Sequence, residues 1–304
     1  MKFALSLFAT LSIIIGAMLF MQYQVYSEQE TPTTKEFSYS QEIEITYREG
    51  SLDIRHHFKN LPNDSLEIVW PELAVDRNCF LEKEYSCARL NDNKTKFESG
   101  ENRSQSISYI IPLEGGLTSE KLMNNIYVSL KNGRVKFSTV HISTDSSVAG
   151  QWVTGLPLID QQSLALVNYS MFSGTGQVRD LYWQESGLSL QKKMDTLSIY
   201  ANTNVSKELS QTVNKLAEFG DEHIAVVQRN NEEVQEGYRM LFLPELTTAT
   251  LQKEVLMAQV ESLYTFVDSP LWLKHVVAMY VSGETFGTPR ALAVVDTLMN
   301  EMTE

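Results

Sequence analysis

Apolar and polar residues alternate along much of the first two thirds of the chain, as they do in strands with one buried face. The clearest case is the segment EIEITY at 42–47, in which every second residue is apolar. A turn at 48–51 and an alternating stretch at 52–58 complete a predicted hairpin. Further strands are expected at 66–70, 106–113, 126–130, 135–143, 163–168, 178–183 and 196–201.

Turn residues separate these stretches at short intervals. The pair Asn132-Gly133 predicts a tight type I′ hairpin turn, because these residues tolerate positive φ angles. Many short strands with frequent turns are typical of antiparallel sheets and sandwiches. The sequence therefore predicts an antiparallel β-sandwich-like domain over residues 37–203.

The pattern changes near Asn204, where helical periodicity begins. Ser206 is placed to cap a helix that extends to Phe219, and Gly220 is placed to end it. The following elements are expected to be strands at 223–228 and 238–243 and helices at 251–267, 271–281 and 289–302. The fold class is therefore predicted to be α+β, with a smaller helix-rich α/β domain over residues 204–304.

An uncharged segment of nineteen residues, Phe3–Met21, lies close to the N-terminus. As a helix it would span roughly 28 Å, near the thickness of the hydrocarbon core of a bilayer. Lys2 precedes the segment and acidic residues follow it, which places the N-terminus in the cytoplasm. Residues 1–27 are therefore a membrane anchor or a signal peptide cleaved near Ser27, and residues 28–36 are a polar linker. Both alternatives place the bulk of the chain outside the cytoplasm.

The chain has two cysteines, Cys79 and Cys87, with seven residues between them. Nearby thiols usually oxidise outside the cytoplasm, so we expect a disulfide that closes a short charged loop. A free redox pair is the alternative. A metal site would need further ligands at a CxxC-like spacing, which the surrounding sequence does not supply.

Composition narrows the possible partners. The 304 residues include 38 acidic and 25 basic side chains, which gives a formal net charge of −13. Such a surface repels phosphate backbones, so no nucleic-acid partner is expected. Hydrophobic residues make up 43% of the chain, as in ordinary globular proteins, which excludes a disordered chain and a many-pass transporter.

The segment WLKHVVAMY at 272–280 follows a helix, two strands and a further helix. It matches the pattern W-L-x-E-G-x-A-x-Y at Trp, Leu, Ala and Tyr. In this order and in this segment the chain resembles the thermolysin-like domain of the gluzincin metallopeptidases, including the membrane-alanyl-aminopeptidase type. The resemblance implies that residues 37–200 correspond loosely to the β-rich N-terminal domain of that family.

The same resemblance places the zinc-binding motif H-E-x-x-H on the segment KEVLM at 253–257, where only Glu254 remains. Lys253 brings a cation where the motif needs a neutral ligand, and the thioether of Met257 is a weak donor. Seventeen residues separate Met257 from His275, where the family has eighteen. The resemblance thus implies a domain without a zinc ion or another cofactor, in which Glu254 and His275 remain the catalytic candidates.

Other residues with reactive or aromatic side chains are expected to have structural roles. His56 and His57 are neighbours on a strand and point to opposite faces, so we expect histidines at the surface or at an edge rather than a chelating pair. His141 and His223 also lie in predicted strands. Most aromatic residues of the β-rich part should pack in the core, and an exposed one could stack on a sugar ring or a peptide strand. These residues are Trp70, Trp152, Tyr169, Tyr182 and Trp183.

The favoured interpretation is a membrane-tethered extracytoplasmic protein that binds and does not catalyse. Its partner would be an envelope protein or a peptide held beside the helix at 251–267, where the edge strand of such a scaffold can pair with an extended segment. One alternative is an extracytoplasmic hydrolase that uses Glu254 and His275. The other is a structural or assembly module at the cell surface.

Overall fold

The computed structural model describes residues 36–302, apart from 82–85, 118, 186, 230–234, 265 and 267. The chain divides into two compact units, Met1–Phe37 and Ser38–Glu304, and the second unit contains all of the architecture below. The hydrophobic segment Phe3–Met21 lies outside the described residues. Among the helices of the described part, none is long and apolar enough to cross a membrane.

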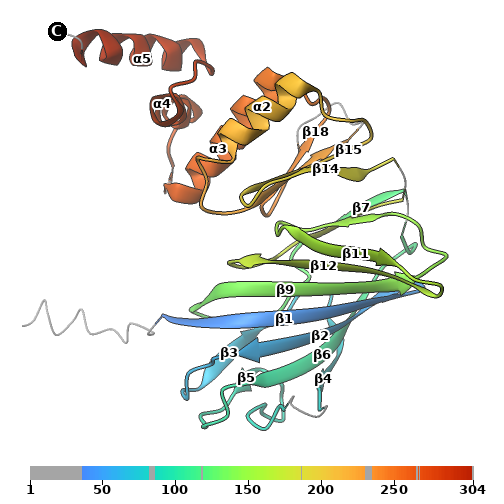
Figure 1. Cartoon of the computed structure of the whole chain (residues 1–304). Coiled ribbons are helices and arrows are strands. Elements are labelled where there is room, and N and C mark those ends of the chain that lie inside the picture. Colours follow the sequence, from blue (N-terminus) through green and yellow to red (C-terminus); the bar gives the residue numbers. More distant parts are fainter. Residues whose placement is uncertain are drawn as a thin grey trace, which may run out of the picture. The chain divides into compact units, whose positions relative to one another are not determined.

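A seven-stranded sheet dominates the first half of the second unit (Figure 1). The predicted hairpin is confirmed: β1 and β2 pair antiparallel through a turn in which Gly50 has a φ of 82°. The order across the sheet is β11-β12-β9-β1-β2-β6-β4. These strands are β1 (Phe37–Arg48), β2 (Ser51–Lys59), β4 (Val75–Cys79), β6 (Gln105–Pro112), β9 (Gly133–Asp145), β11 (Leu158–Ser163) and β12 (Val167–Thr175).

The alternation along β1 sorts its side chains between the two faces of the sheet. Ile43 and Ile45 are buried, whereas Glu42 and Glu44 lie on the opposite, partly exposed face. β1 and β9 run in the same direction in Figure 1, and Tyr39 at the start of β1 lies against Leu130, just before β9. The sheet is therefore mixed, which corrects the prediction of a purely antiparallel arrangement.

Two three-stranded sheets accompany the large one, with orders β5-β3-β8 and β10-β13-β7. The first packs on the buried face, where Phe97 of β5 meets Phe58 of β2 with ring centroids 5.6 Å apart. Trp152 and Trp183 face each other across β10 and β13 and are both buried, as expected for core aromatics. The strands are β3 (Leu66–Val69), β5 (Lys96–Phe97), β7 (Glu120–Met123), β8 (Ser129–Leu130), β10 (Gln151–Val153) and β13 (Leu181–Gln184).

Two local predictions were wrong. Residues 163–168 were expected to form a strand, but they span the turn between β11 and β12. At the Asn132-Gly133 pair, Asn132 has a φ of 59°, yet β8 pairs with β3 and not with the strand that follows the turn. The first error arises because the apolar residues at 164–166 form part of a hairpin turn, and the second because a turn signal does not say which strand lies alongside.

The second half contains a five-stranded sheet of order β14-β15-β16-β18-β17. β15, β16 and β18 are parallel neighbours; α2 connects β15 to β16, whereas the chain passes from β16 to β18 through the edge strand β17. Since β14 and β15 hydrogen-bond into this sheet, it extends across the expected boundary at 203/204. The strands are β14 (Ser189–Lys193), β15 (Leu197–Ala201), β16 (Ile224–Gln228), β17 (Gln235–Gly237) and β18 (Met240–Leu243).

Helices cover one face of the five-stranded sheet, and the β10-β13-β7 sheet packs on the other. Leu197 and Val226 of the sheet share a core with Val213 of α2 and Val255 of α3 (Figure 1). On the opposite face, Phe242 packs edge-on against Tyr182 of β13. The helices are α2 (Lys207–Leu216), α3 (Thr248–Leu263), α4 (Leu271–Ser282) and α5 (Pro289–Met302).

The predicted N-cap of α2 is confirmed, and two prolines mark the starts of later helices. The Ser206 hydroxyl caps α2 by accepting a hydrogen bond from the Leu209 amide, 3.1 Å away. Pro270 is the N-cap of α4, and Pro289 begins α5. α2 ends at Leu216, four residues before the Gly220 that was expected to end it.

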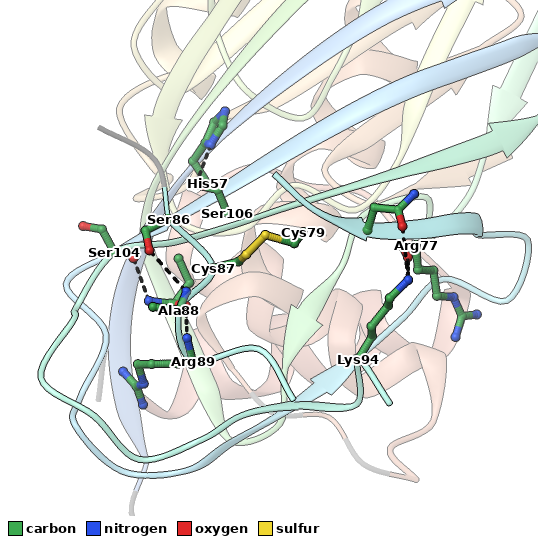
Figure 2. Close-up of a disulfide and its surroundings, with 12 residues drawn as sticks. His57, Arg77, Cys79, Ser86, Cys87, Ala88, Arg89, Lys94, Ser104 and Ser106 are labelled. Atoms are coloured by element: carbon green, nitrogen blue, oxygen red, sulfur yellow. Dashed lines mark hydrogen bonds between the residues drawn. A yellow bond between two sulfur atoms is a disulfide. The ribbon is translucent and has the colours of Figure 1, made fainter. Parts of the chain in front are cut away.

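The predicted disulfide is present and joins the end of β4 to the following loop. The Cα atoms of Cys79 and Cys87 are 5.6 Å apart, within the usual range for such a bond (Figure 2). Close by, the Arg89 side chain is 5% exposed and donates hydrogen bonds to backbone carbonyls of several loops. The acceptors are the carbonyls of Pro62, Asp64, Glu98 and Asn102.

Candidate functional site

The edge of the five-stranded sheet lies beside two helices. β17 is the last strand in the order of this sheet and pairs antiparallel with β18, whose four residues are all buried. The chain continues from β18 into α3, which the Thr247 hydroxyl caps through the Thr250 amide at 3.1 Å. Among the described residues β17 is thus the edge strand of this sheet, and its Glu236 lies within the electrostatic field of α3.

Three carboxylates gather there: Glu236 on β17, and Glu254 and Glu261 on α3. Glu236 is exposed as a residue, but neighbouring atoms cover part of its carboxylate; this desolvation, followed by the charges of Glu261 and Glu254, raises its pKa. Lys253 and Lys274 offset part of this charge, with ion pairs of 2.8 Å to Glu254 and 2.6 Å to Glu261. We call Glu236, Glu254 and Glu261 the acidic edge; three acidic and two basic groups leave it with an excess of negative charge.

The two catalytic candidates are brought into one neighbourhood, where both side chains are largely covered. Glu254 is mostly covered and paired with Lys253. His275 on α4 is 3% exposed, and its Nδ1 accepts a hydrogen bond from the Thr288 amide at 3.3 Å. Burial and the charge of Lys253 lower the pKa of His275, while Glu254 acts in the opposite direction. His275 is therefore a neutral, enclosed side chain.

The loop between α4 and α5 closes over this histidine. Gly287 has a φ of 110°, and a Cβ atom at that position would lie 2.9 Å from the His275 ring. The Phe286 ring packs edge-on against the histidine at a centroid distance of 6.1 Å. A glycine is needed here both for its conformation and for the close approach.

Lys253 is exposed and Met257 half-buried, so the two positions that the resemblance assigns to zinc ligands hold a solvated cation and a packing side chain. Within the described residues, no group of three or more His, Cys, Asp and Glu side chains is arranged to hold a metal ion. Neither residue type in these positions fits a zinc ion, for which thiolate, imidazole or carboxylate ligands are required.

Sequence reasoning missed a polar row on the open face of the seven-stranded sheet. His57 on β2 lies opposite Glu42 on β1, and His141 on β9 places its Nε2 atom 3.4 Å from the Glu42 carboxylate. The Tyr169 hydroxyl lies 2.6 Å from Nδ1 of His141. The alternation at 42–47 placed Glu42 on the polar face, but nothing in the sequence indicated that β9 lies beside β1.

The other histidines also differ from expectation. His56 and His57 were expected at the surface or at an edge, but β2 lies inside the sheet and both side chains are buried: His56 stacks on Phe58, and His57 lies against Phe80. They do point to opposite faces: His56 meets Gln41, and His57 meets Ser106.

Comparison with known proteins gives a limited result. No protein-family model matches the chain, and no curated protein matches it. Among solved structures, the chain is similar to a mutant M1 zinc metallopeptidase from Deinococcus radiodurans, with 12% identity, a TM-score of 0.47, and coverage of 82% of this chain and 70% of that one. A two-domain M1 zinc metallopeptidase mutant bound to L-tryptophan gives 13% identity, a TM-score of 0.47, and coverage of 82% and 72%.

Proposed function

We propose that this protein is a membrane-tethered extracytoplasmic binding protein that holds an extended segment of a partner protein or peptide at the acidic edge and does not catalyse a reaction. The single observation behind the proposal is the position of Glu236, on the strand at the edge of the sheet and within the field of two further carboxylates. An added strand would form backbone hydrogen bonds with β17, and the carboxylates of the acidic edge would favour basic side chains on that strand. A segment that carries lysine or arginine is the matching partner.

The state of the two catalytic candidates supports binding over hydrolysis. A general base must reach the proton that it removes, within about 3 Å of the substrate atom or through one water molecule. His275 is enclosed by the Phe286–Thr288 loop, and Glu254 is already paired with Lys253. The disulfide between Cys79 and Cys87 supports an oxidising compartment, and Phe3–Met21 supplies the membrane tether or the export signal.

The binding proposal is tested with the full-length chain in detergent micelles. Fluorescence anisotropy is measured with a labelled extended peptide that alternates threonine and lysine, and with its counterpart in which glutamate replaces lysine. We expect the basic peptide to bind and Glu236→Gln to weaken its affinity about tenfold, equivalent to ~1.4 kcal/mol. Glu67→Gln is the matched control, because Glu67 is exposed on β3 and its loss should leave the affinity unchanged. Equal binding of the two peptides would contradict the proposal.

Catalysis and membrane attachment are tested separately. Incubation with peptide and ester libraries should give no turnover; turnover that is lost in Glu254→Gln would establish the hydrolase alternative instead. Alkaline carbonate extraction of membranes should leave the chain in the membrane fraction if residues 1–27 are an anchor. Release of a chain that begins near Glu28 would show that the leader is a cleaved signal peptide.

A further inference from the structure

A cavity of about 360 Å³ lies where the β11–β12 hairpin meets the end of β9 and the loop that leads into β10. Its volume is within the range of sites for small ligands. It is formed by residues 144–170 and shares none of them with the acidic edge. The cavity is therefore a separate site from the proposed peptide-binding edge.

The lining of the cavity is polar but carries no charged side chain. Three carboxamides, from Gln161, Gln162 and Asn168, line it together with serine and threonine hydroxyls and the aromatic residues Trp152 and Tyr169. A charged ligand would leave its charge unpaired there, which is costly. Amides and hydroxyls donate and accept hydrogen bonds at once, which matches a ligand rich in hydroxyl groups.

Trp152 gives the cavity a fixed wall. The residue is 3% exposed, and its ring centroid is 4.7 Å from that of Trp183. Gly150 permits this packing, because a Cβ atom there would lie 2.3 Å from the Trp183 ring. The indole Nε1–H of Trp152 is buried and has no hydrogen-bond acceptor among the residues described.

Neighbouring contacts orient the polar groups. The Asn168 amide donates a hydrogen bond to the Val148 carbonyl at 3.1 Å, which ties the hairpin to the loop before β10. The hydroxyl of Tyr169 is engaged by His141, which fixes the ring of the tyrosine at the cavity. Gln161 is exposed, and none of the hydrogen bonds described for the structure uses its side chain. The cavity thus combines two oriented side chains, Asn168 and Tyr169, with the exposed Gln161 carboxamide, which can hydrogen-bond to a ligand.

We propose that this cavity binds a neutral saccharide, which would stack against the aromatic side of the cavity and hydrogen-bond to its carboxamides and hydroxyls. The flat faces of sugar rings carry C–H groups that pack well on aromatic rings, and their hydroxyls match the dual donor and acceptor capacity of amides. The ligand is a free oligosaccharide or the neutral glycan of a larger molecule, since both present the same chemistry.

The test uses the full-length chain in detergent micelles and saturation-transfer difference NMR. The probes are chitotriose and maltotriose as neutral saccharides, trigalacturonic acid as a charged one, and triserine as a neutral peptide. We expect a neutral saccharide to bind with a Kd of the order of 1 mM or below. Both Gln161→Ala and Tyr169→Ala should weaken this binding at least about fivefold.

Gln177→Ala is the matched control, because Gln177 lines a separate cavity beside Trp70 and its loss should leave the affinity unchanged. Gln161 is exposed, so its replacement tests the site without disturbing the core, and the far-ultraviolet circular dichroism of both variants should match the parent chain. The proposal is overturned if neither neutral saccharide binds or if trigalacturonic acid or triserine binds as tightly. It is also overturned if the Gln161 variant binds like the parent chain.

Discussion

Glu120 on β7 and Arg229, directly after β16, form a two-point ion pair between two different sheets. Nε of Arg229 lies 2.8 Å from one carboxylate oxygen of Glu120, and Nη2 lies 2.6 Å from the other. Two further contacts join the β-rich part to the five-stranded sheet: Asp180 accepts from the Tyr238 amide, and His223 reaches the Gly155 carbonyl. Polar contacts thus fix how the two sheets meet, in addition to the apolar packing around Tyr182.

Replacing this carboxylate should weaken the junction. Glu120→Gln removes the charge from a partly buried two-point contact, and we expect the free energy of unfolding to fall by about 1–2 kcal/mol at pH 7. The hydrogen bonds from Arg229 lower the pKa of Glu120, so its stabilisation is complete above the pKa of an unfolded glutamate and is lost as the pH falls through the folded value. The difference between the two proteins should therefore shrink below about pH 4.

Urea unfolding monitored by tryptophan fluorescence measures this difference. Glu67→Gln again serves as the control. Both side chains of the Glu67–Lys131 ion pair are exposed, so we expect the free energy of unfolding to change by less than about 0.5 kcal/mol. A loss in Glu120→Gln no larger than that of the control would show that the junction does not depend on this ion pair.

The disulfide should contribute measurably although its loop is short. The double substitution of Cys79 and Cys87 by serine removes a cross-link with a sequence separation of 8, and chain entropy predicts a loss of about 2–3 kcal/mol. Chemical denaturation under oxidising conditions compares the variant with the parent chain. Treatment of the parent with dithiothreitol should produce a similar loss, and mass spectrometry before reduction should find no free thiols.

Arg89 should matter more than an ordinary surface arginine. Its guanidinium is buried and donates hydrogen bonds to the backbone carbonyls of Pro62, Asp64 and Asn102 in the neighbouring loops. Arg89→Met leaves these carbonyls without a donor, and we expect a loss of about 3 kcal/mol or more in the free energy of unfolding. The exposed Arg134 provides the control, since Arg134→Met should change stability by less than about 0.5 kcal/mol. Equal effects of the two substitutions would contradict this role.

Much of the local structure could be predicted because its signals are local. The alternation at 42–47, the serine at 206 and the two prolines at helix starts each act within one or two turns of chain. The disulfide was also predictable, because the sequence holds two cysteines that lie only eight positions apart.

The neighbours of the strands could not be predicted in the same way. Alternation says which face of a strand is buried but not which strand lies beside it. Gln41 and Ser138 are hydrogen-bonded across β1 and β9 although they lie 97 positions apart in the sequence, and no local pattern encodes that pair. The contact of His141 with Glu42 depends on the same neighbourhood. The cavity beside Trp152 likewise exists only because the hairpin folds back on the loop before β10.

Buried histidines should make the protein less stable in mild acid. His56 is fully buried, and burial lowers its pKa to about 3; burial likewise lowers the pKa of His223 to about 4. The hydrogen bonds of His223 fit the neutral ring, with one nitrogen facing the Gly155 carbonyl and the other facing the Ser198 hydroxyl.

Because these folded pKa values lie below the unfolded value of about 6.5, the unfolded chain takes up the protons first as the pH falls. Stability should therefore decline from about pH 6.5 downward until the folded value is reached, by about 2 kcal/mol for each histidine at pH 5. His223→Gln keeps one donor and one acceptor but cannot be protonated. We expect urea titrations between about pH 4.5 and 7.5 to show one proton fewer taken up on unfolding of this variant. An unchanged slope of the free energy of unfolding against pH would mean that His223 is already protonated in the folded protein. His141→Gln is the control for the loss of a histidine as such, because His141 is partly exposed.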